Sequence, residues 1–459
     1  MKELKAFLSI LVLLPCVVQA QQRHTLTVRE AVGLGYKNVP IAQLDWRIQE
    51  AKNKEIFGQA LPQISGTVSA SHYLRLPGIL FPDATSTAVY SILKEEGVAG
   101  ANGPITNVPA PQLVQVSFQQ PWNLSAGAQL TQLLFQPDVF VGLQARQTAL
   151  SLSAAQLEQV KESVKDSAYR RYYAILIAEK QLGFLDSSIR RLEKLYRDDS
   201  IMYVNGFAER LDLDRVQVQL TNLRTNRSVV QSGITISYAA LKFALGLPQQ
   251  DEVVLREELT VDSLKTGLLD ESFQYEDRAE IRTLTEAKKL QELDVKRNKL
   301  AALPTVSAVG NYSVNGQGQK FFTHNSTIWI NSSFVGLNIS VPIFDGFQRR
   351  YRVQQSQLNV EKVENNIEFV KQAIDFDQVA SKESLKNALL NLDMQARNME
   401  LAERVYNTTK IKFEQGLGSS FEVLQADSDF QQAQSNYFNA LYNATIARIG
   451  YLRSLGKLP

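Results

Sequence analysis

The chain has 459 residues, which is enough for two or three ordinary domains or for one large repeated architecture. Its 49 basic and 47 acidic residues give a formal net charge of +2, and this balance gives no reason to expect a nucleic-acid partner or a strongly acidic substrate. Most of the charged residues are therefore expected to form a solvated surface.

The N-terminus has the pattern of a secretory signal peptide. Two lysines precede an apolar stretch from Ala6 to Leu14, and small residues follow as far as Ala20, so residues 1–20 are expected to be removed. The only cysteine, Cys16, lies in this segment, and a cysteine-free exported chain fits the periplasm or the outer membrane. Past residue 20, no apolar run approaches the roughly 20 residues that a transmembrane helix needs.

The rest of the chain is predicted to contain two copies of one unit. Asn205-Gly206 and Gln415-Gly416 are 210 residues apart, and other matching pairs recur at the same spacing. We expect a first repeat over residues 21–246, a periplasmic and irregular middle insert over 247–275, and a second repeat over 276–459. Each repeat is predicted to run helix, strand, loop, strand, long helix, turn, long helix.

The first repeat has the longer loop between its strands. Leu61-Pro62 and Leu303-Pro304 are 242 residues apart, since 303 − 61 = 242, whereas later landmarks are 209 or 210 apart. About 33 additional residues therefore lie between Pro62 and Phe135, in a position where a loop tolerates them most easily.

Four short segments with alternating side chains are predicted to be strands. They are Ile64–Tyr73, Ser125–Phe135, Pro304–Tyr312 and Phe334–Ile343. On alternation alone, a soluble sandwich with one wet face is an alternative, but four isolated strands within a helical chain make it less favourable. Gly316-Gln317-Gly318 lacks the third glycine and the helix start of a dinucleotide site, and it is expected to be a loop.

Long amphipathic helices are predicted after the second strand of each repeat. Positions at alternating spacings of three and four residues from Leu213 to Leu241 are mostly apolar, and the positions 210 residues later, from Val423 to Tyr451, are all apolar or aromatic. This pattern is a coiled-coil-like seam. The helix over about residues 347–412 would be on the order of 100 Å long at about 1.5 Å per residue, which is far longer than a globular domain needs.

These elements together suggest a protein that is anchored in the outer membrane and has its helices in the periplasm. Four strands cannot close a barrel, because the smallest spanning barrels use about eight. Open strand edges cannot face lipid, since unpaired backbone groups there are costly. Several chains must share one barrel, and the strand count by itself permits a dimer or a trimer.

The sequence resembles the TolC-like outer-membrane efflux proteins over nearly the whole mature chain. The resemblance rests on the duplication, on Leu-Pro at the first strand of each copy, on Val341–Gly346 after the last strand, and on Phe413–Gly416 leading to Phe421–Ala426. It implies a mixed α/β membrane protein. The expected fold is a homotrimer with a 12-strand outer-membrane β-barrel, four strands per chain, continued by a long α-helical periplasmic barrel.

The resemblance also implies partners and a gate. A periplasmic adaptor (membrane fusion) protein and an inner-membrane transporter are expected to dock and open a periplasmic mouth, while outer-membrane lipid surrounds the barrel. The apolar stretch Leu76–Pro82 in the long loop is expected to be extracellular and to pack on the barrel rim. Lining the outer opening and contacting another surface component are alternatives.

In the family, acidic side chains just after the hairpin turn narrow the mouth. The matching positions are Glu422 and Gln425, with Asp212 equivalent to Glu422 in the first repeat, and carboxylates collected there by symmetry would attract cations. Alternatively, Asp212 and Glu422 are simply acidic residues favoured near helix N-termini. Phe413 and Gly418 stand where the family has a tyrosine and an arginine that hydrogen-bond across the closed mouth. The closed mouth must therefore be held by other contacts, or be held less tightly.

The turns between the long helices are expected to be the periplasmic tips of the molecule. Adaptor docking is predicted within residues 205–209 and 415–419. The central positions are Asn205, Gly206, Phe207, Gln415, Gly416 and Leu417.

No catalytic residue, metal site or cofactor is predicted, and we do not expect an enzyme. His24, His72 and His324 are far apart, and none has a metal-ligand spacing. The predicted function is the outer-membrane channel of a tripartite export system for small toxic compounds or other cargo. A duct for type I protein secretion is an alternative, and a structural surface coiled-coil protein is a less favoured one.

Overall fold

The structure is a computed structural model that describes residues 23–37, 40–257, 264, 273–320 and 327–459. The predicted signal peptide, part of the middle insert and His324 lie outside the described residues. The chain divides into two compact units, each built from separate stretches of sequence. The sheet unit consists of Ala51–Arg146 and Leu293–Gln357, and the helical unit consists of Met1–Glu50, Gln147–Glu292 and Leu358–Pro459.

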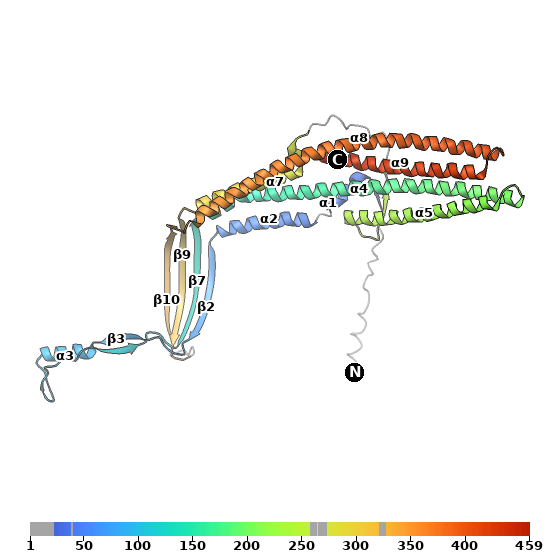
Figure 1. The fold of residues 1–459 in the computed structure, drawn as a ribbon. Coiled ribbons are helices and arrows are strands. Elements are labelled where there is room, and N and C mark those ends of the chain that lie inside the picture. Colours follow the sequence, from blue (N-terminus) through green and yellow to red (C-terminus); the bar gives the residue numbers. More distant parts are fainter. Residues whose placement is uncertain (1–22, 38–39, 258–263, 265–272, 321–326) are drawn as a thin grey trace, which may run out of the picture. The chain divides into compact units, whose positions relative to one another are not determined.

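The sheet unit contains a four-stranded antiparallel sheet with the order β10-β9-β7-β2 (Figure 1). Its strands are β2 (Gln63–His72), β7 (Trp122–Phe135), β9 (Thr305–Gly318) and β10 (Thr327–Ser340). The four predicted strands are present, but β10 begins seven residues earlier than expected and ends before Val341.

The expectation of a loop at Gly316–Gly318 is wrong, because β9 continues through these residues and pairs with the start of β10. Packing favours glycine at position 316. A Cβ atom at Gly316 would stand 2.9 Å from the ring of Trp329, its partner in the register. The indole therefore occupies the space that a side chain at Gly316 would need.

The strand register gives the sheet one apolar and one polar face. Ile64, Leu130, Gly310 and Val335 form one cross-strand row of the apolar face. Both ends of this row are uncovered, since Ile64 is 76% and Val335 is 89% exposed. On the other face, Ser69, Ser125 and Asn315 form a polar row that ends at Ile330 on β10, and the hydroxyl groups of Ser313 and Ser332 are hydrogen-bonded at 2.8 Å. The alternation therefore largely separates two environments on β2, β7 and β9, whereas β10 places Ile328, Ile330 and Phe334 on the face that is polar elsewhere.

The long segment between β2 and β7 has secondary structure of its own, which the prediction of a loop did not include. It contains β3 (Ile79–Asp83), α3 (Thr85–Glu95), β4 (Ala99–Gly100), β5 (Gly103–Pro104) and β6 (Gln112–Val116). β3 pairs with β6 in antiparallel orientation. The apolar side chains of β3 are exposed in the described chain, Ile79 at 63% and Leu80 at 64%. Packing of this segment on a barrel rim stays a prediction.

The helical unit contains two long hairpins (Figure 1). Their helices are α4 (Pro137–Val204), α5 (Arg210–Leu245), α8 (Gln348–Glu414) and α9 (Ser420–Ser454). The predicted seam is largely buried. Its buried members are Val216, Leu220, Leu223, Ile234 and Leu241 on α5 and Val423, Ala426, Phe430, Ala440, Ala444 and Tyr451 on α9. One hydrophobic cluster contains residues from all four helices, so the two hairpins pack against each other.

Shorter elements complete the chain. They are β1 (Arg23–Leu26), α1 (Val28–Lys37), α2 (Pro40–Gln59), β8 (Glu252–Leu255), a 3₁₀ turn (Tyr275–Asp277) and α7 (Ala279–Leu300). β1 and β8 pair in parallel, so the middle insert is not irregular throughout. Among the described residues, no helix combines the length and the apolar character needed to cross a membrane.

Candidate functional site

The two hairpin turns have the same backbone geometry. Gly206 and Gly416 adopt positive φ angles of 76° and 75°. In each turn, the amide after the glycine donates to the carbonyl oxygen five residues earlier, at 2.8 Å from Phe207 and 2.9 Å from Leu417. This left-handed helix ending strongly favours glycine. The predicted turns are therefore present, and they end both hairpins in the same way.

The tips present apolar side chains to solvent. Phe207 is 84% and Leu417 is 76% exposed. Asn205 is used locally, since its side-chain amide donates to the carbonyl oxygen of Ile201 at 2.7 Å, and Gln415 is exposed beside Gly416. The tips are therefore hydrogen-bonded turns that each carry an uncovered apolar side chain.

Asp429, an acidic residue that the sequence reasoning missed, lies near the predicted constriction. Glu422 is exposed in the first turn of α9, where its backbone amide donates to the hydroxyl oxygen of Ser419 at 3.3 Å. The amide of Gln425 donates to Asp429 at 2.9 Å on the next turn. Glu422, Gln425 and Asp429 are spaced by three and four residues and share one helix face. Although position 425 is a glutamine, this face carries two carboxylates, those of Glu422 and Asp429.

This face continues along α9 as a polar stripe at alternating spacings of three and four residues. Its members, all exposed, are Glu422, Gln425, Asp429, Gln432, Asn436, Asn439 and Asn443. Gln432 donates to Asn436 at 3.0 Å, repeating the bond made one heptad earlier. Each stripe residue precedes a seam residue by one position, so α9 buries one face and presents amides on a neighbouring one. The stripe could have been predicted from the sequence, because its polar residues recur next to those of the apolar seam.

In the first hairpin, Asp212 is engaged by a basic residue. Arg215 Nη1 lies 3.4 Å from Asp212 Oδ1, and the same guanidinium lies 4.9 Å from the centre of the Phe421 ring. Asp212 and Arg215 belong to α5 and Phe421 to α9, so this cation–π contact joins the two hairpins close to their tips. Sequence spacing alone could not show this contact.

Phe413 and Gly418, the two departures from the family's mouth pattern, have different environments. Phe413 is buried in the hydrophobic cluster between the hairpins, where it makes apolar contacts. At Gly418, a Cβ atom would stand 3.2 Å from the Glu422 carboxylate, so a side chain there would crowd the first turn of α9.

A buried ion pair connects the hairpins deeper in the bundle. Asp427 on α9 is fully buried, and Arg191 Nε on α4 lies 2.9 Å from Asp427 Oδ1. The guanidinium also lies over the rings of Tyr406 and Phe430, at 5.2 and 5.1 Å from their centres. Burial raises the pKa of Asp427, and Arg191 opposes this rise.

Comparisons with known proteins agree with this architecture. The outer membrane efflux protein family matches residues 286–457. "Outer membrane protein TolC" of Vibrio cholerae is 20% identical over 363 residues, which cover 77% of this chain and 82% of the relative. "Protein CyaE" of Bordetella pertussis is 22% identical over 442 residues, which cover 94% of this chain and 84% of the relative.

The fold is shared with solved channels. The crystal structure of CusC has a TM-score of 0.69 at 15% identity and covers 93% of this chain and 91% of its own. The Campylobacter jejuni CmeC outer membrane channel has a TM-score of 0.68 at 14% identity, with coverages of 94% and 85%.

Residues 286–457 belong to the outer membrane efflux protein family, and the chain as a whole is similar to TolC-like outer-membrane efflux proteins. Its family is one of outer-membrane channels rather than enzymes, and the protein resides in the outer membrane. The resemblance seen in the sequence is thereby confirmed.

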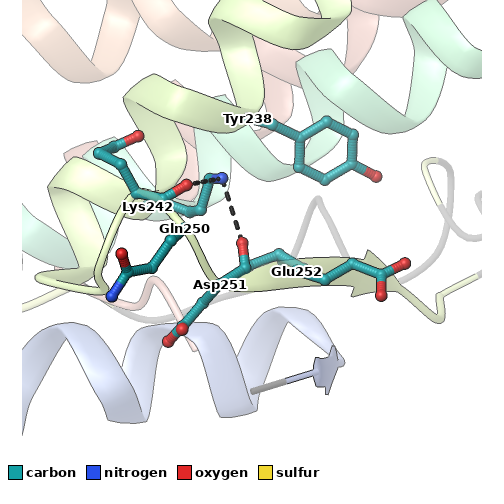
Figure 2. Close-up of a pocket in the computed structure, with 7 residues that line it drawn as sticks. Tyr238, Lys242, Gln250, Asp251 and Glu252 are labelled. Atoms are coloured by element: carbon teal, nitrogen blue, oxygen red, sulfur yellow. Dashed lines mark hydrogen bonds between the residues drawn. The ribbon is translucent and has the colours of Figure 1, made fainter. Parts of the chain in front are cut away.

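An open hollow at the C-terminal end of α5 is lined by residues that make local polar contacts (Figure 2). Lys242 Nζ donates to the backbone oxygens of Gln249 and Asp251 at 2.7 and 3.2 Å. The Asp251 side chain lies 3.2 Å from His24 Nε2. These contacts hold the chain after α5 against α5 itself and β1, and the groups do not converge on a common point as catalytic groups would.

His72, like His24, has a contact with a neighbouring side chain. The rings of His72 and Trp122 contact each other in a tilted arrangement, with their centres 4.2 Å apart. In the described part of the chain, no group of three or more His, Cys, Asp or Glu residues is arranged to hold a metal ion.

Proposed function

We propose that the efflux protein is a homotrimeric outer-membrane duct, in which three copies of the sheet unit form a 12-strand barrel. The main support is the four-stranded sheet with an uncovered apolar face and two edge strands, β2 and β10. Lipid can cover the apolar face, but it cannot satisfy the backbone groups of an open edge. Pairing β10 of one copy with β2 of the next removes the edges, and 3 × 4 = 12 strands is an even number within the range of such barrels.

The helical unit supports the same assembly. On α5, a second apolar line lies outside the seam, and its members are exposed. They are Leu211, Val218, Val229, Ile236 and Phe243, from 53% to 81% exposed. A periodic apolar line of this kind indicates a helix neighbour that the single chain lacks. Adjacent copies around a threefold axis would cover it and form a helical tube.

The polar stripe of α9 is proposed to line the lumen of this tube. Neutral amides offer hydrogen bonds without a fixed charge, so varied cargo can pass without tight binding. Glu422 and Asp429 add carboxylates at the tip end, where three copies would form two acidic rings that concentrate cations. Asp212 and Gln425 would lie in the same constriction. The cargo class proposed is small toxic compounds delivered from the periplasm.

We further propose that a periplasmic adaptor and an inner-membrane transporter supply the cargo. The adaptor would dock on the tips, where Phe207 and Leu417 give each hairpin an exposed apolar anchor. The rest of the proposed docking surface is Asn205, Gly206, Gln415 and Gly416. Charge changes at Phe207 and Leu417 that leave adaptor binding intact would argue against this surface.

Conductance in planar bilayers tests the proposed duct. The purified protein should run as a trimer and give a cation-selective conductance that trivalent cations block. Glu422→Ala combined with Asp429→Ala should reduce both selectivity and block, while Asn443→Ala, at the other end of the stripe, should keep both. Well-folded oligomers without conductance would refute the duct, and a conductance indifferent to both carboxylates would place the constriction elsewhere.

A further inference from the structure

Asp199 is a buried carboxylate that has no cationic partner among the described residues. It lies on α4, five residues before the helix ends at Val204. Its side chain has 0% exposure, and neither carboxylate oxygen has a hydrogen-bond partner among the described residues. Buried carboxylates are normally paired or hydrogen-bonded, because an uncompensated charge in the interior is costly. Neighbouring copies in an oligomer could only increase this burial.

The charged groups around Asp199 do not compensate its charge. Asp198 from its own helix and Asp212 from α5 are both acidic, and α9 contributes the neutral hydroxyl group of Ser420. The nearby Arg215 is already engaged by Asp212 and by Phe421.

The two lysines of the adjoining groove between α4 and α8 are both engaged by a carboxylate. Lys194, Lys410 and Glu414 line a groove together with Asp198. Both lysines face the Glu414 carboxylate, at 3.4 and 3.9 Å. Burial raises the pKa of Asp199 to about 6, helped by Asp212 and Asp198 and opposed by Ser420.

Asp427 shows what a stabilised buried carboxylate looks like in the same bundle. It is as deeply buried as Asp199, but it pairs with Arg191 and accepts a hydrogen bond from Gln431. The two residues are buried aspartates in the same unit, and they differ in whether a neighbouring cation compensates the charge of the carboxylate. The absence of a partner at Asp199 is thus a local feature of the tip region.

We propose that Asp199 is a built-in destabilising group that biases the hairpin tips toward separation and makes this bias sensitive to protons. When the tips are packed, the carboxylate is held beside α5 and α9 without compensation. When they separate, water reaches it. The effect concerns the packing of α4 against α5 and α9, and it rests on the proposed function only in treating the tips as the mouth of a duct.

The direction of the pH effect follows from the two states. The packed state binds the Asp199 proton more tightly than the separated state, so packing is most stable at low pH and weakens as the pH rises from about 4 to above 6. With an ordinary value of 3.8 and a buried value of about 6, ionisation at neutral pH favours separation by on the order of a hundredfold.

Hydrogen–deuterium exchange tests this proposal on the purified full-length protein in detergent. Peptides covering residues 201–212 and 413–423 are followed for the parent and for Asp199→Asn. The neutral variant should exchange more slowly at pH 7.5, by on the order of ten- to a hundredfold. The ratio of parent to variant, which cancels intrinsic amide chemistry, should fall by about tenfold between pH 7.5 and pH 5.

Asp198→Asn is the matched control, because it removes the same charge one residue away and should change exchange far less. Asp199→Leu is a second neutral variant, and it should also slow exchange if charge is the cause. Equal or faster exchange in both Asp199 variants, or a parent-to-variant ratio that does not change with pH, would overturn the proposal. Exchange does not require conduction, so bilayer recordings would fail or succeed separately and would report on the duct itself.

Discussion

The ion pair of Arg191 with Asp427 should be a main electrostatic link between the hairpins, and Asp427→Asn should weaken it strongly. The Arg191 side chain is 22% exposed and the Asp427 side chain 1%, so the variant leaves a mostly buried cation over the rings of Tyr406 and Phe430. Removing one partner of a buried pair costs about 3 to 5 kcal/mol. Because Arg191 keeps some water and both ring contacts, we expect a loss of about 3 kcal/mol, at the lower end of this range.

Urea unfolding of the helices, followed by circular dichroism at 222 nm, measures this loss as a shift in the midpoint. The double variant Arg191→Met with Asp427→Leu serves as the control, because replacing both charges by apolar side chains removes the unpaired cation. It should recover most of the stability. A single variant that costs less than about 1 kcal/mol, or a double variant as unstable as the sum of the single changes, would refute the assigned role of the pair.

Three further predictions concern the tips and the sheet. Arg215→Gln should loosen the tip by about 0.5 to 1 kcal/mol and raise the open fraction of single-channel recordings about two- to fivefold, whereas Arg224→Gln, farther from the tips, should not. Gly206→Val should speed amide exchange in its turn, because a β-branched residue at a positive φ is strained, while Gly233→Val in the middle of α5 should leave the turn unchanged. Gly316→Leu should reduce the yield of assembled oligomer in native electrophoresis, because its Cβ would meet the Trp329 ring, and Gly336→Ala should be tolerated.

The local periodicities in the sequence were enough to locate the hairpins. The spacing of apolar residues from Leu213 and from Val423 located the buried seam, and glycine marked the turns at Gly206 and Gly416. These features depend on contacts between near neighbours along a helix, which is why spacing predicts them. The strand bounds were less accurate, because a ladder can extend through residues such as Gly316 whose fit depends on the opposite strand.

The site was only partly predictable for the same reason. Glu422 and Gln425 lie on an exposed face of α9, as helical spacing implies, and the stripe containing Asp429 could have been found in the same way. The stacking of Arg215 on Phe421 and the isolation of Asp199 depend on how α4, α5 and α9 approach one another.

The sequence by itself determined the order of strands and long helices, the seam and the turns, because these follow from side-chain spacing and backbone preference. Only the tertiary structure decided which charges have partners. Asp427 and Asp199 are both aspartates in amphipathic helices, yet one meets Arg191 and the other meets Ser420 beside two acidic residues. A charge is stabilised by what lies within a few ångströms across a helix interface, and no pattern along one chain segment contains that information.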